Sequence, residues 1–128
     1  MNTESIMTIE ETLFMSVTDF LLWMDDHFSL DTPPRMDSDE DVHRGLDVLN
    51  IYAGMTDYLK TLSSYAKVYA RDLKRKGKEY KTDYEDMVDR ENIINNKLDA
   101  IKLSYQAVNK CITIYVEEKR ASQNYTRR

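Results

Sequence analysis

Apolar residues recur in two long stretches of this chain at alternating steps of three and four. The first series is Val48, Tyr52, Met55, Leu59, Leu62, Ala66, Tyr69 and Leu73. The second series is Met87, Glu91, Ile94, Leu98, Ile101, Tyr105, Val108, Ile112 and Tyr115. A mean period of 3.5 residues places each series on one stripe of a helix, as in coiled coils. The pattern predicts two long helices with matching apolar faces, with Leu59 and Leu98 fully buried.

The ends of these helices are marked by capping signals. Asp37 or Ser38 can cap the first helix, and the cations Arg75 and Lys76 followed by Gly77 are typical of its C-terminus. The segment 82–85 has the Thr-x-x-Glu capping box that opens the second helix. We therefore expect helices over about 39–76 and 83–120, folded into an antiparallel hairpin by a short turn.

A shorter third helix precedes the hairpin. A capping box begins at Thr8, and apolar residues recur at helical spacing as far as Phe28, which predicts a helix over about 8–28. Pro33 and Pro34 mark a stiff, extended connector. The apolar face of the following helix is widened near its start, so we expect the third helix to pack on the open half of the hairpin. The fold class is all-α: a single helical domain, 1–128, built on a long antiparallel coiled-coil-like hairpin.

This arrangement leaves the tip half of the hairpin, about 65–95, packed as two helices only. Such a segment buries one stripe per helix, so a second copy or another partner would stabilise it. The tip is therefore expected to be either mobile or completed by a protein partner or a second copy, and we predict that the protein self-associates as a homo-oligomer. The residues before Thr8 and from Ser122 to Arg128 are expected to be loose ends.

Composition narrows the alternatives. With three Gly and two Pro in 128 residues, the chain has little material for the turns of a sandwich or barrel. No apolar run approaches the ~18 residues of a membrane span, so no membrane association is expected. The one cysteine, Cys111, excludes an internal disulfide and fits a cytoplasmic location.

Charge is distributed unevenly along the chain. Residues 1–41 carry eleven acidic side chains and one basic one, whereas residues 42–128 carry twelve acidic and seventeen basic side chains. The chain is therefore an acidic N-terminal segment attached to a basic hairpin, although its overall net charge is −5.

The basic residues gather at the predicted hairpin tip. We call the following residues the basic tip: Lys67, Arg71, Lys74, Arg75, Lys76, Lys78 and Lys81. Tyr65 and Tyr80 are interleaved with them and lie outside the two apolar series. Basic side chains that contact phosphates, beside aromatic rings that stack on bases, are typical of single-strand binding. A solvated hairpin end is the structural alternative.

A second candidate surface is acidic. We call its residues the acidic face: Asp25, Asp26, Asp37, Asp39, Glu40 and Asp41. These side chains could mimic phosphates and occupy a basic groove on a nucleic-acid enzyme, or they could fold onto the protein's own basic hairpin. As a structural alternative, they supply a solvated surface and favourable charge near helix N-termini.

Signals for catalysis are few. Glu40 and His43 have the spacing of a di-iron ligand pair, but the motif occurs once. Asp86 and Asp89 are similar to the acidic helices of all-α nucleotide pyrophosphatases that bind magnesium, although the facing helix is basic. We predict no enzyme activity, no catalytic residue, no metal site and no cofactor.

Residues 65–120 resemble small helical phage proteins, including mediators that help load a recombinase on single-stranded DNA. The resemblance rests on the run YAKVYARDLKRKGKEYK followed by an amphipathic helix that begins DMVDRENIINNKLDAIKLSY. It implies an interaction protein and no catalytic residue.

Three functional hypotheses follow. The first is a non-enzymatic phage or mobile-element accessory module that acts on single-stranded nucleic acid or on a nucleic-acid-bound protein. The second is an acidic inhibitor protein that blocks a host nucleic-acid enzyme or defence complex. The third is a small all-α, magnesium-dependent nucleotide hydrolase.

Overall fold

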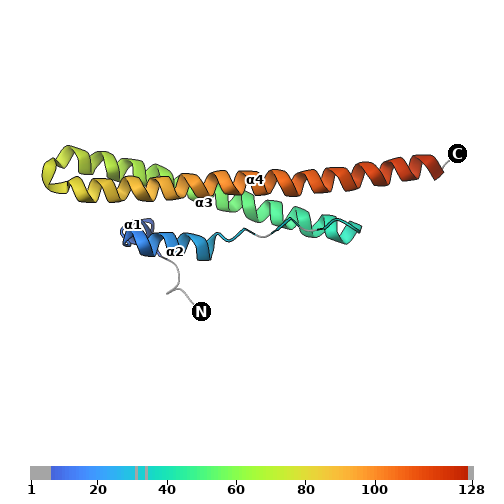
Figure 1. Ribbon diagram of the computed structural model, residues 1–128, viewed down its shortest axis with the longest axis horizontal. Coiled ribbons are helices and arrows are strands. Elements are labelled where there is room, and N and C mark those ends of the chain that lie inside the picture. Colours follow the sequence, from blue (N-terminus) through green and yellow to red (C-terminus); the bar gives the residue numbers. More distant parts are fainter. Residues whose placement is uncertain (1–6, 31, 34, 127–128) are drawn as a thin grey trace. The chain divides into compact units, whose positions relative to one another are not determined.

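The chain folds as an all-α helical hairpin. The computed structural model describes residues 7–30, 32–33 and 35–126, and these form helices without a strand. The elements are α1 (Ile9–Leu13), α2 (Val17–His27), α3 (Asp39–Lys76), the 3-10 turn η2 (Lys78–Tyr80) and α4 (Lys81–Thr126). The long helix α4 packs antiparallel on α3 (Figure 1), which confirms the predicted fold class.

The hairpin is divided into two compact units. The first, here the turn unit, combines Thr56–Asp99 with the described residues up to Ser29. The second, here the terminal unit, combines Leu30–Met55 with the described residues from Ala100 onward. Each unit thus contains a part of α3 and a part of α4.

The limits of α3 agree with the prediction. The Ser38 hydroxyl accepts a hydrogen bond from the Asp41 backbone N–H at 3.1 Å, and the Asp41 carboxylate accepts one from the Asp37 N–H at 2.9 Å. The last turn contains Lys74, Arg75 and Lys76. Their positive charges are stabilised there by the negative end of the helix dipole. Capping signals and charge therefore determine both ends of α3.

The turn itself depends on Gly77. Its φ of 101° and ψ of −167° fall in a region that is essentially accessible to glycine alone. The Tyr80 N–H then donates to the Gly77 carbonyl at 3.1 Å and forms the 3-10 turn η2. The absence of a Cβ at Gly77 allows the chain to reverse in so few residues.

Two predicted limits of the last helix are wrong. The helix begins at Lys81, because η2 already supplies its first turn and the Thr82 capping box is not used. It also continues through residues 122–126, which were expected to be a loose tail. Residues 127–128 and 1–6 lie outside the described part of the chain.

The predicted helix 8–28 is two helices. Thr8 caps α1 as expected, since its hydroxyl accepts from the Glu11 N–H at 3.1 Å. However, α1 ends after Leu13, and Ser16 caps α2 by accepting from the Asp19 N–H at 3.1 Å. The chain therefore bends at Phe14–Ser16 instead of continuing as one helix.

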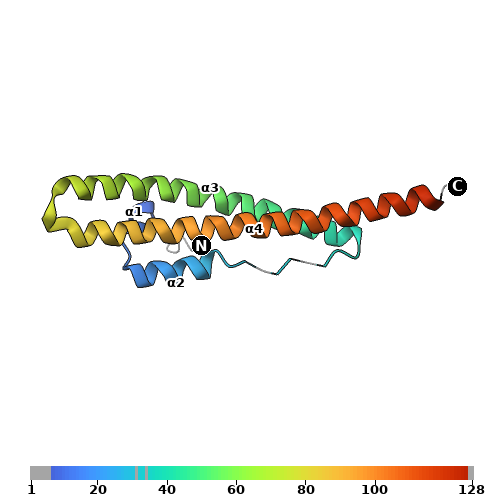
Figure 2. The ribbon, with the colours of Figure 1, turned by 45° about the horizontal axis from the view of Figure 1, so that its top comes forward.

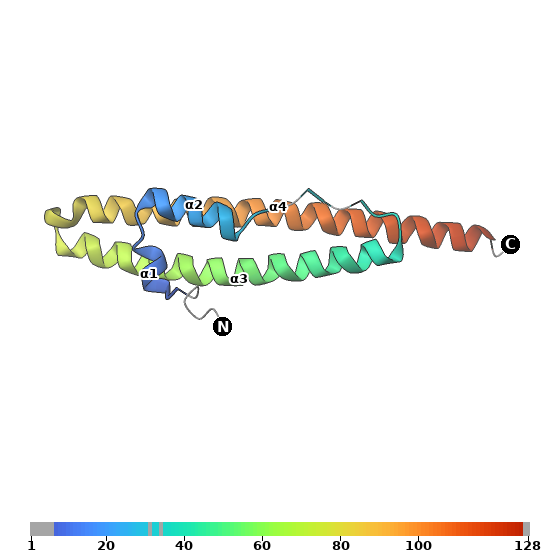
Figure 3. The same ribbon diagram turned by 90° about the horizontal axis from the view of Figure 1, so that it is seen from below.

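The N-terminal helices pack on the turn unit, so their predicted place on the open half of the hairpin is wrong. Figure 2 and Figure 3 both show α2 lying along the hairpin, and Figure 3 shows α1 crossing α3, where Glu10 and Phe14 contact Tyr69. The ring of Phe28, at the end of α2, stacks on Tyr58 with centroids 5.8 Å apart. Tyr58 lies in the part of α3 that belongs to the turn unit.

The turn unit therefore has three layers, and its core is formed by all of them. Its fully buried apolar side chains are Leu13, Phe20, Met24, Leu59, Leu62, Ala66, Met87 and Ile94. In the terminal unit the buried apolar side chains are Leu49, Tyr52, Ile101, Val108 and Ile112.

The second apolar series is less symmetric than its sequence suggests. Met87 and the residues at successive steps of seven, as far as Val108, are at most 1 % exposed. The alternate positions lie at the edge of the contact: Leu98 is half-buried and Tyr105 is 39 % exposed. The predictions that Leu98 is fully buried and that Tyr105 belongs to the core are therefore wrong.

Two of the three glycines provide a first test of this backbone description. We expect Gly54→Ala to stabilise the protein by about 1 kcal/mol, because a Cβ there meets no atom within 4 Å and alanine favours the helix. Gly77→Ala should instead destabilise by about 1–3 kcal/mol, because its φ is positive. Urea unfolding followed by circular dichroism measures both changes, and the same sign for both variants would contradict the described turn.

Leu59 and Leu98 test the described burial. We expect Leu59→Ala to cost about 2–5 kcal/mol, because its fully buried side chain would leave a cavity. Leu98→Ala should cost clearly less, because water already reaches part of this side chain. Glu117→Ala, on the exposed surface of α4, serves as the control and should change stability by less than about 0.5 kcal/mol. A larger destabilisation at Leu98 than at Leu59 in the same unfolding experiment would refute this register.

Candidate nucleic-acid interface

A buried arginine fixes the bend between α1 and α2 on the hairpin. Arg90 of α4 is only 7 % exposed, and its Nε and Nη2 atoms donate to the Met15 carbonyl at 3.0 and 2.7 Å. Burial lowers the pKa of Arg90, while the nearby carboxylates, led by Asp86, oppose that shift. The guanidinium satisfies a carbonyl of the bend and thereby determines where the neighbouring Phe14 lies.

Phe14 contacts the hairpin through Tyr69 of α3. The two rings meet edge to face with centroids 5.1 Å apart, yet Phe14 remains 56 % exposed. The Tyr69 hydroxyl donates to the Glu10 carboxylate at 3.1 Å. Burial raises the pKa of Tyr69, and the hydrogen bond to Glu10 adds to this rise. The exposed Phe14 ring is thus held in place by contacts of Glu10 on one side of it in the sequence and of Met15 on the other.

These side chains border a groove of about 440 Å³ in the turn unit, here called the Phe14 groove. Its lining consists of Phe14, Tyr69, Asp72, Leu73, Arg75 and Lys76. Helical spacing places Tyr65 on the same face of α3, one turn before Tyr69. Tyr65 is 46 % exposed. The face therefore presents two exposed aromatic side chains and, further along α3, two cations.

The basic tip is exposed throughout, as its charge pattern predicts. Two of its lysines lie over tyrosine rings of the turn: the Lys76 Nζ is 5.2 Å from the Tyr80 ring centroid, and the Lys74 Nζ is 5.9 Å from that of Tyr84. Lys81 approaches Glu85 at 4.0 Å. The sequence-predicted Tyr80 is 37 % exposed and is partly occupied by the protein's own lysine.

The predicted acidic face is divided between the two units. Asp25 and Asp26 belong to the turn unit, and the other four carboxylates belong to the terminal unit. Asp25 pairs with Lys97 at 3.6 Å, Asp37 with Arg35 at 2.9 Å, and Glu40 with Arg44 at 2.9 Å. Of these pairs, Asp25–Lys97 joins the acidic face to the hairpin, as in the folded-back alternative. The other two are local, because Arg35 lies two residues before Asp37 and Arg44 lies one turn after Glu40 in α3.

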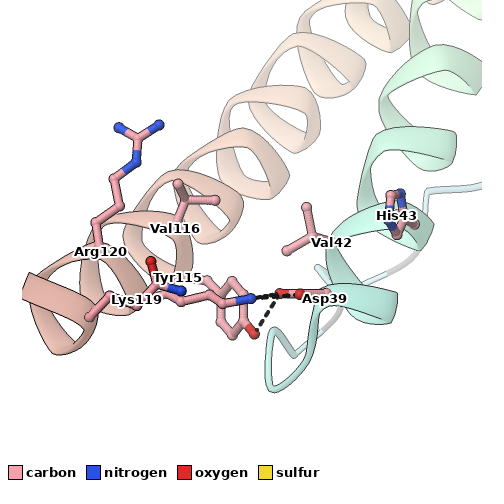
Figure 4. A pocket seen from close by; sticks show the side chains of 8 residues that line it. Asp39, Val42, His43, Tyr115, Val116, Lys119 and Arg120 are labelled. Atoms are coloured by element: carbon pink, nitrogen blue, oxygen red, sulfur yellow. Dashed lines mark hydrogen bonds and ion pairs between the residues drawn. The ribbon is translucent and has the colours of Figure 1, made fainter. Parts of the chain in front are cut away.

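A second hollow lies in the terminal unit (Figure 4). Its volume is about 380 Å³, and Val42 and Val116 point into the space between α3 and α4. At its edge the Lys119 Nζ donates to both Asp39 oxygens at 2.6 Å, and the Tyr115 hydroxyl donates to Oδ1 at 3.1 Å. Chiefly through the Lys119 hydrogen bonds, this contact holds the pKa of Asp39 below its ordinary value of 3.8.

Among the described residues, no three His, Cys, Asp or Glu side chains come together as candidate metal ligands. In the same part of the chain, no helix combines the length and hydrophobicity needed to span a bilayer.

Comparison of this chain with protein-family models, with curated proteins and with solved structures finds no match. The resemblance of residues 65–120 to phage recombination mediators therefore stays a prediction.

Sequence reasoning identified the cations of this interface but missed Phe14 and Arg90. Phe14 fits the helical spacing of the predicted helix 8–28, which predicts a place on the apolar face of that helix. Arg90 is preceded by the acids Asp86 and Asp89, which is the pattern of a solvated helix face. The Ser16-x-x-Asp19 spacing, a helix-capping signal, could have revealed the bend that exposes Phe14.

The Asp39–Lys119 contact predicts a specific titration. The pKa of Asp39 is lowered in the folded state, so the contact favours folding above pH 3.8, and this stabilisation disappears as pH falls through the folded-state pKa. We expect carboxyl ¹³C NMR to show Asp39 titrating below 3.8, and Lys119→Met should raise this pKa. Lys110→Met, at an exposed position of α4, is the control and should leave it unchanged. An unaltered Asp39 titration in Lys119→Met would contradict the contact.

Proposed function

We propose that this protein is a non-enzymatic helical module that binds single-stranded nucleic acid at the turn of its hairpin. The carrying observation is the face of α3 in the turn unit. Tyr65 and Tyr69 lie one turn apart on that face, and Phe14 contacts Tyr69 from the end of α1. Arg75 and Lys76 line the Phe14 groove together with Phe14 and Tyr69. Stacking platforms beside a basic surface are the two ingredients of sequence-tolerant single-strand binding.

Charge supports the same surface. Seven basic side chains lie between residues 67 and 81, against two acidic ones, and all seven are exposed. A single strand carries one negative charge per nucleotide, and binding at such a surface releases counterions. The resemblance of residues 65–120 to phage recombination mediators, predicted from the sequence, is compatible with this proposal.

The acidic face is a weaker candidate. Asp39 and Asp25 pair with Lys119 and Lys97, so a basic partner would have to displace these lysines. The Asp41 carboxylate accepts a hydrogen bond from the Asp37 N–H, and the Asp41 N–H donates to the Ser38 hydroxyl at the start of α3. These contacts explain the carboxylates as parts of the fold and favour the basic tip as the binding surface.

Two charge variants with equal net charge test the proposal. The first changes Lys74, Arg75 and Lys78 to Ser at the basic tip. The second changes Lys102, Lys110 and Arg120 to Ser, at exposed positions of the terminal unit. Only the first should weaken binding of a single-stranded oligonucleotide in fluorescence anisotropy. Its log–log salt slope should flatten by roughly 0.7 for each phosphate that the variant no longer neutralises.

Equal weakening in the two variants would indicate a general charge effect and would refute the assignment to the tip. Absence of oligonucleotide binding by the unmodified protein at low salt would refute nucleic-acid binding altogether. Circular dichroism should show the same helix content in both variants, because every substituted side chain is exposed.

A further inference from the structure

The Phe14 groove contains more than a basic surface needs for contacting phosphates. An exposed aromatic ring and a carboxylate lie on the same groove as two cations. The ring is brought there by α1, a part of the chain remote in sequence from the basic tip. The carboxylate, Asp72, would weaken phosphate binding if it had no other role, because like charges repel.

The position of Phe14 is well determined. Arg90 holds the adjacent Met15 carbonyl, and Glu10, one turn before Phe14, accepts the Tyr69 hydrogen bond. The edge-to-face contact with Tyr69 uses only part of the Phe14 ring, which leaves more than half of the side chain exposed. A flat ligand that stacks there meets a ring whose position is already fixed, so little conformational entropy is lost.

Asp72 gives the groove a hydrogen-bond acceptor. Among the described residues, no ion pair or hydrogen bond to its carboxylate is formed, although Arg75 is one turn away on the same helix. An ionised carboxylate accepts hydrogen bonds and donates none. It therefore matches the exocyclic amine of cytosine, and it repels the carbonyl oxygen that uracil carries at the same position.

We propose that the Phe14 groove holds one amine-bearing base of a single strand. The base stacks on Phe14 and donates its exocyclic amine to Asp72, and the adjoining phosphates contact Arg75 and Lys76. This inference rests on the proposed function and adds a preference for cytosine over uracil, two bases of similar size. Because the groove addresses base and phosphate, the preference applies to DNA and RNA alike.

Binding of oligo(dC) and oligo(dU) of equal length, measured by fluorescence anisotropy, tests the preference directly. The unmodified protein should bind oligo(dC) roughly fivefold more tightly, as expected for one charged hydrogen bond at a partly exposed site. Asp72→Asn should bring this ratio close to one, because the amide can donate to uracil as well as accept from cytosine. Oligo(rC) and oligo(rU) should give the same ratio as their DNA counterparts.

Glu79→Gln is the matched control for Asp72. Glu79 is an exposed carboxylate of the turn that does not line the groove. Its loss should strengthen binding of both oligonucleotides equally and leave their ratio unchanged. Phe14→Leu should weaken binding of oligo(dC) roughly tenfold without changing the salt slope, because stacking releases no counterions. Phe14→Tyr keeps the ring and should restore most of the affinity.

The outcomes separate this inference from the proposed function. If the unmodified protein binds neither oligonucleotide at low salt, both proposals fail. If it binds both with equal affinity, and Phe14→Leu and Asp72→Asn bind like the unmodified protein, the basic tip remains the binding surface and the base-holding role of the groove is refuted. A ratio that Glu79→Gln abolishes as fully as Asp72→Asn would also refute it. Thermal melting should first show that Phe14→Leu is folded.

Discussion

The candidate interface depends on one buried contact, the Arg90 guanidinium on the Met15 carbonyl. A charged side chain with so little exposure must satisfy its donors within the protein, and here two of them converge on a single backbone oxygen. That oxygen lies in the bend between α1 and α2. The contact therefore joins the acidic N-terminal segment to the basic hairpin through a backbone carbonyl and not through a carboxylate. It also places Phe14 beside Tyr69. The third layer that it secures belongs to the turn unit.

Local signals allowed much of the fold to be predicted. The limits of α3 were found because an N-terminal cap, a run of cations and Gly77 each mark a helix end independently. The bend at residues 14–16 was missed because the spacing of apolar residues indicates only which face of a helix is buried. That spacing stays helical across the short break between α1 and α2. The placement of the N-terminal helices was missed for another reason. It depends on tertiary contacts such as those of Phe28 with Tyr58 and of Arg90 with the Met15 carbonyl, which the hydrophobic pattern does not encode.

The candidate site divides in the same way. The exposed cations of the basic tip could be predicted, since seven basic residues in fifteen cannot all be buried. The Phe14 groove could not, because it combines residue 14 with residues 69–76 through tertiary packing. The tyrosines show both cases: Tyr65 is exposed as its position outside the apolar series predicts, whereas Tyr80 is partly covered by Lys76. Only the structure shows which aromatic side chains remain available for stacking.

The most direct test of a single-strand-binding turn is to map the contact on the protein itself. Titration of the ¹⁵N-labelled protein with oligo(dC) at low salt, followed by backbone amide NMR shifts, measures the response of amide groups in both units at once. We predict that the largest shifts fall at residues 65–81 and at Phe14–Met15, with small changes in the terminal unit. Shifts concentrated at residues 37–41, or no shifts at all, would contradict a nucleic-acid interface at the turn.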